Sequence, residues 1–141
     1  FRNIDAEAVP VAWYAGLAHA SMNQPDKALP YYLKASIQHP TRVMVLNNLG
    51  KTYIDLGRFK DGRKAIEKAL DILPDYPEAL TNLSASYYAE KDYPNALKYL
   101  LQIPPPKRTE IVKTNIRALT GIIRNQKEND QHHVENPGPR Q

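Results

Sequence analysis

The chain repeats one apolar pattern at an interval of 34 residues. The stretch LNNLGKTYIDLGRF, residues 46–59, returns as LTNLSASYYAEKDY, residues 80–93, and a looser copy precedes both. Small residues and proline keep the same interval, and the recurring sets are Gly16, Gly50 and Ser84; Ala28, Gly62 and Ala96; Ala35 and Ala69; and Pro40 and Pro74. A fixed period of this length is typical of a stacked repeat, because each unit can bury its apolar face only against its neighbours.

Within each copy, the apolar spacing predicts two helices joined by a short turn. In the second copy, a stripe spaced 3, 1 and 3 forms one face of an α-helix, and its members are Leu46, Leu49, Gly50 and Tyr53. Gly57 interrupts this stripe and Pro74 ends the next one, as expected near helix ends. Antiparallel helices approach to roughly 8–10 Å only where the crossing side chains are small, so the recurring small residues predict the crossings. Tyr53 and Tyr87 are predicted to fill the wider space between neighbouring pairs.

This pattern resembles the tetratricopeptide repeat, and its hallmarks here are Leu46, Leu49, Gly50, Tyr53, Gly57, Phe59, Gly62, Ala69 and Pro74. The resemblance implies an all-α fold: a right-handed α-α superhelix of three helix hairpins followed by a C-terminal capping helix. The three repeats are expected at residues 10–41, 42–75 and 76–106. One departure is Gly62, which replaces an alanine of the family and is expected to loosen the second helix by up to about 1 kcal/mol.

The residues outside the repeats are assigned by pattern. Residues 107–127 are predicted to form the capping helix, because Val112, Ile116, Leu119 and Ile123 make an amphipathic stripe. Its opposite face carries Lys113, Arg117, Thr120 and Arg124, which accounts for most of the basic excess in a chain of net charge +4. Residues 128–141 are predicted to be a disordered tail. Residues 1–9 are interpreted as a stub or as the end of a preceding element.

Composition argues against several functional classes. The chain has no cysteine, so disulfides, thiolate metal sites and cysteine nucleophiles are excluded. No apolar run is long enough to span a bilayer, and no phosphate-binding or hydrolase motif occurs. The four histidines show no ligand spacing, so neither a metal nor a cofactor is expected, and the chain itself is predicted to be non-catalytic. Because the first residue is Phe1 rather than methionine, we expect a fragment of a longer protein.

The first helices of the hairpins should line a concave groove that suits an extended peptide or a helix. Counting helical faces away from the buried stripe selects Trp13, Leu17, Met44, Asn47, Lys51, Ile54, Asp55, Glu78, Thr81 and Tyr88 as groove residues. The alternative is that Trp13 and Ile54 are half-buried contacts between repeats and that the groove is not used. A protein or peptide is therefore the expected partner, and nucleic acid and membrane insertion are not expected.

Members of the family that bind chaperone tails hold the terminal carboxylate with a set of lysine, arginine and asparagine side chains. In this sequence, the matching places hold Trp13, Leu17, Asn48, Glu78 and Asn82. Asn48 alone fits this set, and Glu78 would repel a carboxylate. Chaperone-tail docking is therefore rejected on the charge of these positions.

The preferred function is a scaffold for protein–protein interaction. A second interpretation rests on the runs WYAGLAHASMNQPDKALPYYLKAS and PDYPEALTNLSASYY, which are similar to the repeat module at the C-terminal end of some bacterial O-antigen ligases and polysaccharide polymerases. That resemblance implies a membrane-embedded glycan-transfer parent whose catalytic part lies outside this chain. A third interpretation is nucleic-acid or anionic-surface binding through Lys113, Arg117 and Arg124. The ligand, the compartment and the oligomeric state stay open.

Overall fold

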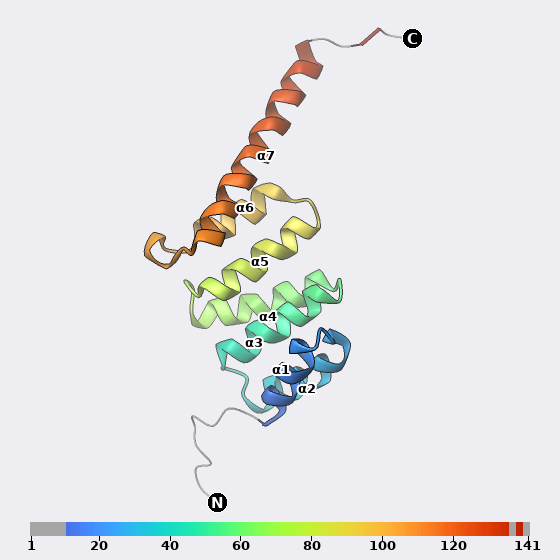
Figure 1. The fold of residues 1–141 in the computed structure, drawn as a ribbon, viewed down its shortest axis with the longest axis vertical. Helices are drawn as coiled ribbons and strands as arrows, with labels where there is room; N and C mark the ends of the chain where they lie inside the picture. Colours follow the sequence, from blue (N-terminus) through green and yellow to red (C-terminus); the bar gives the residue numbers. More distant parts are fainter. Residues whose placement is uncertain (1–10, 136–137, 140–141) are drawn as a thin grey trace, which may run out of the picture.

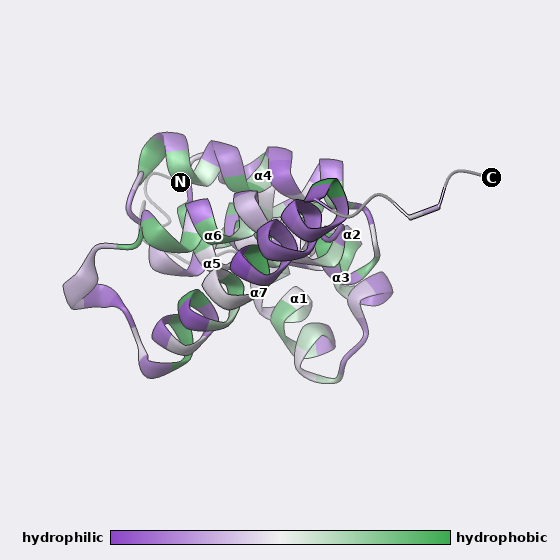
Figure 2. Cartoon of the chain, turned by 90° about the horizontal axis from the view of Figure 1, so that it is seen from above, coloured by the Kyte–Doolittle hydropathy of each residue, from purple (hydrophilic) through white to green (hydrophobic). Residues whose placement is uncertain are grey.

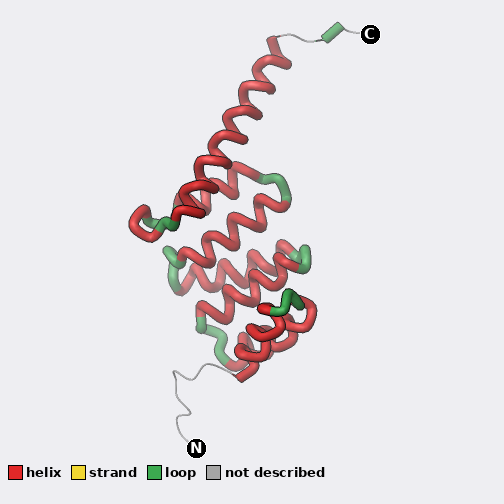
Figure 3. The backbone as a smooth tube through the Cα atoms, in the orientation of Figure 1, coloured by secondary structure: helices red, strands yellow, loops and turns green. Residues whose placement is uncertain are grey.

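The computed structural model describes residues 11–135 and 138–139. Over these residues, seven α-helices and one short 3-10 helix follow one another, and no strand occurs (Figures 1 and 3). The elements are α1 (Val11–Ser21), α2 (Pro25–Gln38), α3 (Val43–Asp55), α4 (Phe59–Ile72), α5 (Pro77–Ala89), α6 (Tyr93–Leu101), η1 (Pro105–Lys107) and α7 (Glu110–Glu135). The predicted all-α superhelix of hairpins is confirmed, with α1–α2, α3–α4 and α5–α6 as the three hairpins.

The turn inside each hairpin has the same backbone geometry in all three copies. One turn residue adopts a positive φ in each copy, and these residues are Asn23 at 55°, Gly57 at 75° and Lys91 at 61°. The next residue donates its N–H to a carbonyl five residues earlier at 2.8–3.0 Å, and the pairs are Gln24–His19, Arg58–Tyr53 and Asp92–Tyr87. This bond closes the last turn of the first helix, so each hairpin begins its second helix in the same direction.

The recurring small residues do mark the helix crossings. A Cβ on Gly16 would lie 2.7 Å from the Tyr32 ring, and a Cβ on Gly50 would meet the Ile66 side chain. A Cβ on Gly62 would lie 2.8 Å from the Gly50 carbonyl oxygen and 2.8 Å from Ile54 Cγ1. The expectation that Gly62 merely loosens its helix therefore missed its role, because the missing Cβ allows α3 and α4 to meet backbone to backbone.

Neighbouring hairpins share apolar clusters. Val45 of α3 packs against Ala12 and Ala35 of the first hairpin. Tyr53 and Tyr87 are partly buried against such clusters, as predicted from their spacing. Each hairpin therefore closes the apolar face of the one before it, which is the arrangement that a stacked repeat requires.

The capping helix α7 is longer than expected. Val112 and Leu119 are buried against α6, and Ile116 packs beside them, so the predicted apolar stripe is confirmed. The helix continues to Glu135, however, and the disordered tail predicted from residue 128 is wrong for residues 128–135. These eight residues contain neither glycine nor proline, so nothing in them stops a helix that is already formed. Residues 1–9, 136–137 and 140–141 lie outside the described residues.

Candidate functional site

Two cavities lie along the first helices of the hairpins. One has a volume of about 390 Å³ and lies between α5 and α7, and the other has a volume of about 250 Å³ and lies between α1 and α3. Lys51 lines the second cavity, and Ala85, its equivalent 34 residues later, lines the first. Since equivalent positions of the repeat line both cavities, both open on the same side of the array, where the sequence predicts the groove.

The α5–α7 cavity has an uncharged lining, which is formed by Thr81, Ser84, Ala85, Tyr88, Leu100, Asn115, Ala118, Leu119 and Ile122. Two of its hydroxyls are already engaged, since Thr81 donates to the Pro77 carbonyl at 2.8 Å and Ser84 donates to the Ala96 carbonyl at 2.7 Å. The Tyr88 ring is 54% exposed at its edge. The cavity therefore offers apolar contacts, with the Asn115 amide and the Tyr88 hydroxyl as polar groups.

The α1–α3 cavity contains a charge pair. Lys51 Nζ lies 2.7 Å from Asp55 Oδ2, one helical turn away, and both side chains are about half exposed. Leu17 and Tyr32 supply apolar contacts beside this pair. Because the lysine and the aspartate neutralise one another, this end of the groove presents little net charge to a ligand.

Three predicted groove residues lie inside the repeat stack. Trp13 packs between the first and second hairpins, and its indole N–H has no hydrogen-bond partner among the described residues. Ile54 packs against the cluster of Ile66 and Leu83. Asn47 is buried, and its side-chain oxygen accepts a hydrogen bond of 2.9 Å from the Asn82 amide. These three side chains hold neighbouring hairpins together and are not placed to contact a ligand in the groove.

The remaining predicted residues are divided among three places. Leu17, Lys51 and Asp55 lie in the α1–α3 cavity, whereas Thr81 and Tyr88 lie in the α5–α7 cavity. Met44 lines a separate shallow hollow that the two connections between hairpins share, and Glu78 is exposed in the first turn of α5. Burial and then the Glu78 charge raise the pKa of the Tyr76 hydroxyl.

Sequence analysis missed the wall that α7 contributes. Asn115, Ala118 and Ile122 line the α5–α7 cavity, although this helix was interpreted only as a cap. A signal was present, because the 3, 1, 3 spacing of the first helices returns at Ile116, Leu119, Thr120 and Ile123. The interval from the third copy is 36 residues rather than 34, so α7 is a displaced equivalent of a first helix.

The basic face of α7 is largely occupied by contacts within the helix. Lys113 Nζ lies 3.0 Å from Glu110 Oε1, and this bond, with Arg117 further away, lowers the pKa of the Glu110 carboxyl. Arg117 donates to the Thr114 hydroxyl at 3.2 Å. The helix has no phenylalanine, tyrosine or tryptophan on which a base could stack.

The described residues were also searched for other kinds of site. Within residues 11–135 and 138–139, no group of three or more histidine, cysteine, aspartate or glutamate residues is placed to hold a metal ion. None of the helices described there is both long enough and apolar enough to cross a membrane.

Comparison with known proteins agrees with this geometry. The tetratricopeptide-repeat family model matches residues 14–75 and 47–109. Among solved structures, the first tetratricopeptide domain of human RPAP3 has a TM-score of 0.75 at 18% identity, and the match covers 84% of this chain and 94% of that one. The same domain of Spaghetti, bound to the HSP90 peptide SRMEEVD, also has a TM-score of 0.75 at 18% identity, over 87% and 98% of the two chains.

A third similar structure is that of MamA AMB-1, with a TM-score of 0.61 and 25% identity over 69% of this chain and 57% of that one. The likeness to the RPAP3 domains at 18% identity establishes the fold. The family model, in contrast, matches this chain over more than half of its sequence, from residue 14 to residue 109. The chain therefore belongs to the tetratricopeptide-repeat family.

Proposed function

We propose that the chain is a non-catalytic scaffold that binds a protein or peptide in its groove, with an apolar side chain of the ligand held between α5 and α7. The observation that carries this proposal is the uncharged cavity of about 390 Å³, open beside the exposed Tyr88 ring. Its volume lies within the range of about 300–1,000 Å³ that is usual for ligand pockets. Complete burial of one leucine or phenylalanine side chain contributes about 1.5–3 kcal/mol, enough to anchor a peptide.

The charge of the groove indicates which peptides fit. The similar domains of Spaghetti and of yeast Sti1 are described with HSP90 ligands, and the second domain of human RPAP3 is described with the HSP70 peptide SGPTIEEVD. The positions of this chain that match a carboxylate-binding set contain no cation, and one of them is the exposed Glu78. An acidic tail would leave its carboxylates unpaired here, so we propose a ligand with an apolar anchor and no requirement for a terminal carboxylate.

The two other interpretations have less support. The matched family model and the similar structures cover the repeats alone, so they do not bear on an O-antigen ligase or polymerase parent, which stays a prediction from the sequence. Binding of nucleic acid or of an anionic surface through α7 is disfavoured, because Lys113 is paired with Glu110 and α7 has no aromatic platform.

A peptide-display selection against the 141-residue chain, followed by fluorescence anisotropy on the selected peptides, tests the proposal. Ala118→Trp should fill the α5–α7 cavity and weaken binding by at least about tenfold, which corresponds to the loss of one buried apolar anchor. Asn125→Trp, two helical turns further along α7 and outside the cavity lining, is the matched control and should leave affinity unchanged. Equal affinity for Ala118→Trp and the unaltered chain would rule out the cavity as the anchor site.

The peptide SRMEEVD serves as a second probe of the charge argument. We expect no saturable binding of this peptide, because the groove lacks the cations that would pair with its carboxylates. Saturable binding that is lost when the terminal carboxylate is amidated would show that the rejection of chaperone-tail docking is wrong.

A further inference from the structure

The outward face of α1 carries an apolar stripe, formed by Val11, Ala15, Ala18 and Met22, which are spaced 4, 3 and 4 along the chain. The Val11 side chain is 85% exposed and Met22 is 57% exposed. Helix α1 contains no aspartate, glutamate, lysine or arginine, so no charge interrupts the stripe. This helix lies at the N-terminal end of the array, opposite to α7 (Figure 1).

The equivalent positions in the other two copies are the contacts between stacked hairpins. Val45 and Ala79, which are 34 and 68 residues after Val11, are fully buried. Thr52 and Ser86, the equivalents of Ala18, are buried as well. The same face of the same helix is therefore covered by a preceding hairpin wherever such a hairpin is present.

The contacts in those copies show what covers the face. In the second copy, Val45 packs against Ala12 and Ala35 of the preceding hairpin. In the third copy, the face ends in polar contacts, since Ser86 and Glu90 both bind Arg63 of the preceding hairpin. The stripe on α1 has apolar Ala18 and Met22 at those two positions, so it requires an uncharged partner surface.

The chain itself is too short to supply this cover. Ten residues precede Val11, and the connections between hairpins, residues 39–42 and 73–76, each use four. Six residues would remain, whereas the hairpin that covers α3 consists of helices of 11 and 14 residues. A second molecule must therefore supply most of the cover.

We propose that the α1 stripe is a dimer interface that binds the α1 stripe of a second copy of this chain around a two-fold axis. Like surfaces meet at such an axis, and a surface without charge does so without repulsion. An antiparallel crossing would place Val11 against Met22 of the partner subunit, with the small Ala15 and Ala18 at the centre, where they allow close approach. Helix α7 presents a mostly hydrophilic surface at the other end of the array (Figure 2), so the assembly stops at two copies.

Sedimentation equilibrium on the 141-residue chain over a range of micromolar concentrations tests this interface. We expect a monomer–dimer equilibrium, and Ala18→Glu should raise the dimer dissociation constant at least about 100-fold because it buries an unpaired carboxylate at the centre. Ile37→Glu places the same charge on an exposed apolar position of α2, outside the stripe, and should leave the constant unchanged. Circular dichroism would verify that both variants are folded, as expected because both residues are exposed.

A cysteine cross-link gives a second, independent measurement, because the chain has no cysteine of its own. Ala18→Cys should form an intermolecular disulfide under mild oxidation, whereas Ile37→Cys should not. A chain that stays monomeric at all concentrations would leave the stripe to a different partner and would overturn the proposal. A dimer that is insensitive to Ala18→Glu, or equal cross-linking of the two cysteine variants, would overturn it as well.

Discussion

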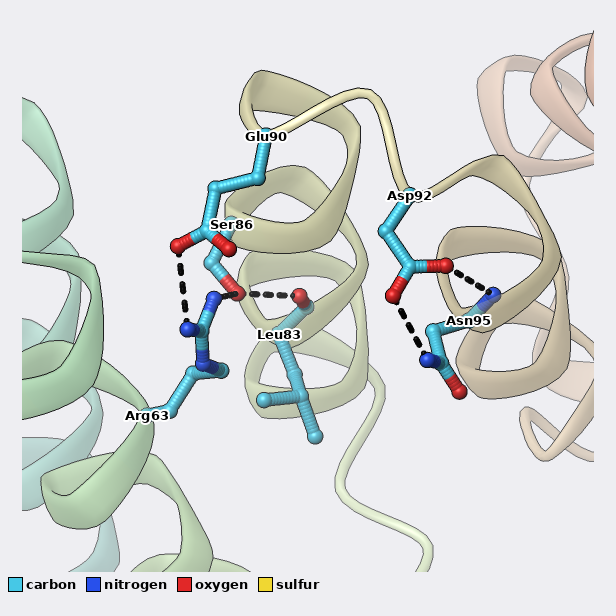
Figure 4. A network of polar contacts seen from close by, with 6 residues as sticks. All are labelled: Arg63, Leu83, Ser86, Glu90, Asp92 and Asn95. Atoms are coloured by element: carbon cyan, nitrogen blue, oxygen red, sulfur yellow. Dashed lines mark hydrogen bonds and ion pairs between the residues drawn. The ribbon is translucent and has the colours of Figure 1, made fainter.

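Arg63 of α4 and Glu90 at the C-terminal end of α5 form an ion pair of 3.0 Å that joins the second hairpin to the third (Figure 4). The Arg63 side chain is only 13% exposed, and its guanidinium carbon lies 4.6 Å from the centre of the Tyr87 ring. The same guanidinium approaches the Ser86 hydroxyl at 3.5 Å. One arginine therefore links three positions of the α5 surface that faces the preceding hairpin.

We predict that Arg63→Met lowers the free energy of unfolding by about 1–2 kcal/mol, since it removes a partly buried ion pair and a cation–π contact while keeping the aliphatic packing. Lys113→Met removes the exposed Lys113–Glu110 pair and should change stability by no more than about 0.5 kcal/mol. Urea denaturation followed by circular dichroism measures both variants. Equal, small losses would show that the Arg63 contacts do not stabilise the boundary between hairpins.

Two glycines in helices should respond to alanine in opposite directions. A Cβ at Gly50 would meet the Ile66 side chain and would lie 2.9 Å from the Gly62 carbonyl oxygen, so Gly50→Ala forces α3 and α4 apart. We expect a loss of about 1–3 kcal/mol in the free energy of unfolding, despite the better helix propensity of alanine. Gly121→Ala meets nothing within 4 Å and should gain about 0.5–1 kcal/mol. Thermal unfolding of the two variants gives the sign of each change, and a gain for Gly50→Ala would contradict the close crossing.

The turn of the third hairpin contains a residue that is unsuited to its backbone. Lys91 adopts a φ of 61°, whereas Gly57 occupies the equivalent position of the second hairpin at 75°. Lys91→Gly should therefore raise the free energy of unfolding by up to about 1 kcal/mol, because glycine adopts this conformation without steric cost. Gly57→Ala should lower it by a similar amount. The measurement is the midpoint of urea unfolding, and a loss for Lys91→Gly would mean that the lysine side chain makes a stabilising contact.

The 34-residue spacing predicted the hairpins well because the crossings depend on residue size, which the sequence states directly. Gly16 and Gly50 lie where the helices meet, as expected. The groove was harder to predict, because a helical face does not tell a half-buried position from an exposed one. Trp13 and Ile54 lie at the margin between the groove and the stack, and large apolar side chains at that margin turn inward.

The length of α7 was also beyond the sequence patterns. Residues 128–135 are polar and carry no apolar period, so they were interpreted as disordered. Polar residues weaken a helix much less than glycine or proline does, and those residue types first return at Pro137. The hydrogen bonds of a preformed helix are sufficient to extend it through such a segment without tertiary contacts.

The pair of Asp75 and Lys107 links the connection after α4 to η1 and should give a measurable pH effect. Lys107 Nζ lies 2.9 Å from Asp75 Oδ2, and this hydrogen bond and the lysine charge lower the pKa of the Asp75 carboxyl. Since the folded pKa lies below the unfolded one, the pair stabilises the fold above the unfolded pKa, and this contribution is lost as the pH falls through the folded value. Lys107→Gln should raise the Asp75 pKa in an NMR titration of its carboxyl carbon. Lys113→Gln should leave the Asp75 pKa unchanged and raise that of Glu110 instead.

Helix α7 should consist of a stable half and a weakly protected half. Leu119 is buried against α6, so Leu119→Ala should cost about 2–4 kcal/mol and uncover the apolar end of the stack. Val134 is 81% exposed, and Val134→Ala should have almost no effect. Hydrogen exchange should show protection of the amides around Leu119 and rapid exchange beyond residue 124, where all the described side chains of the helix are exposed. Slow exchange over residues 125–135 would mean that another surface covers this half of the helix in solution.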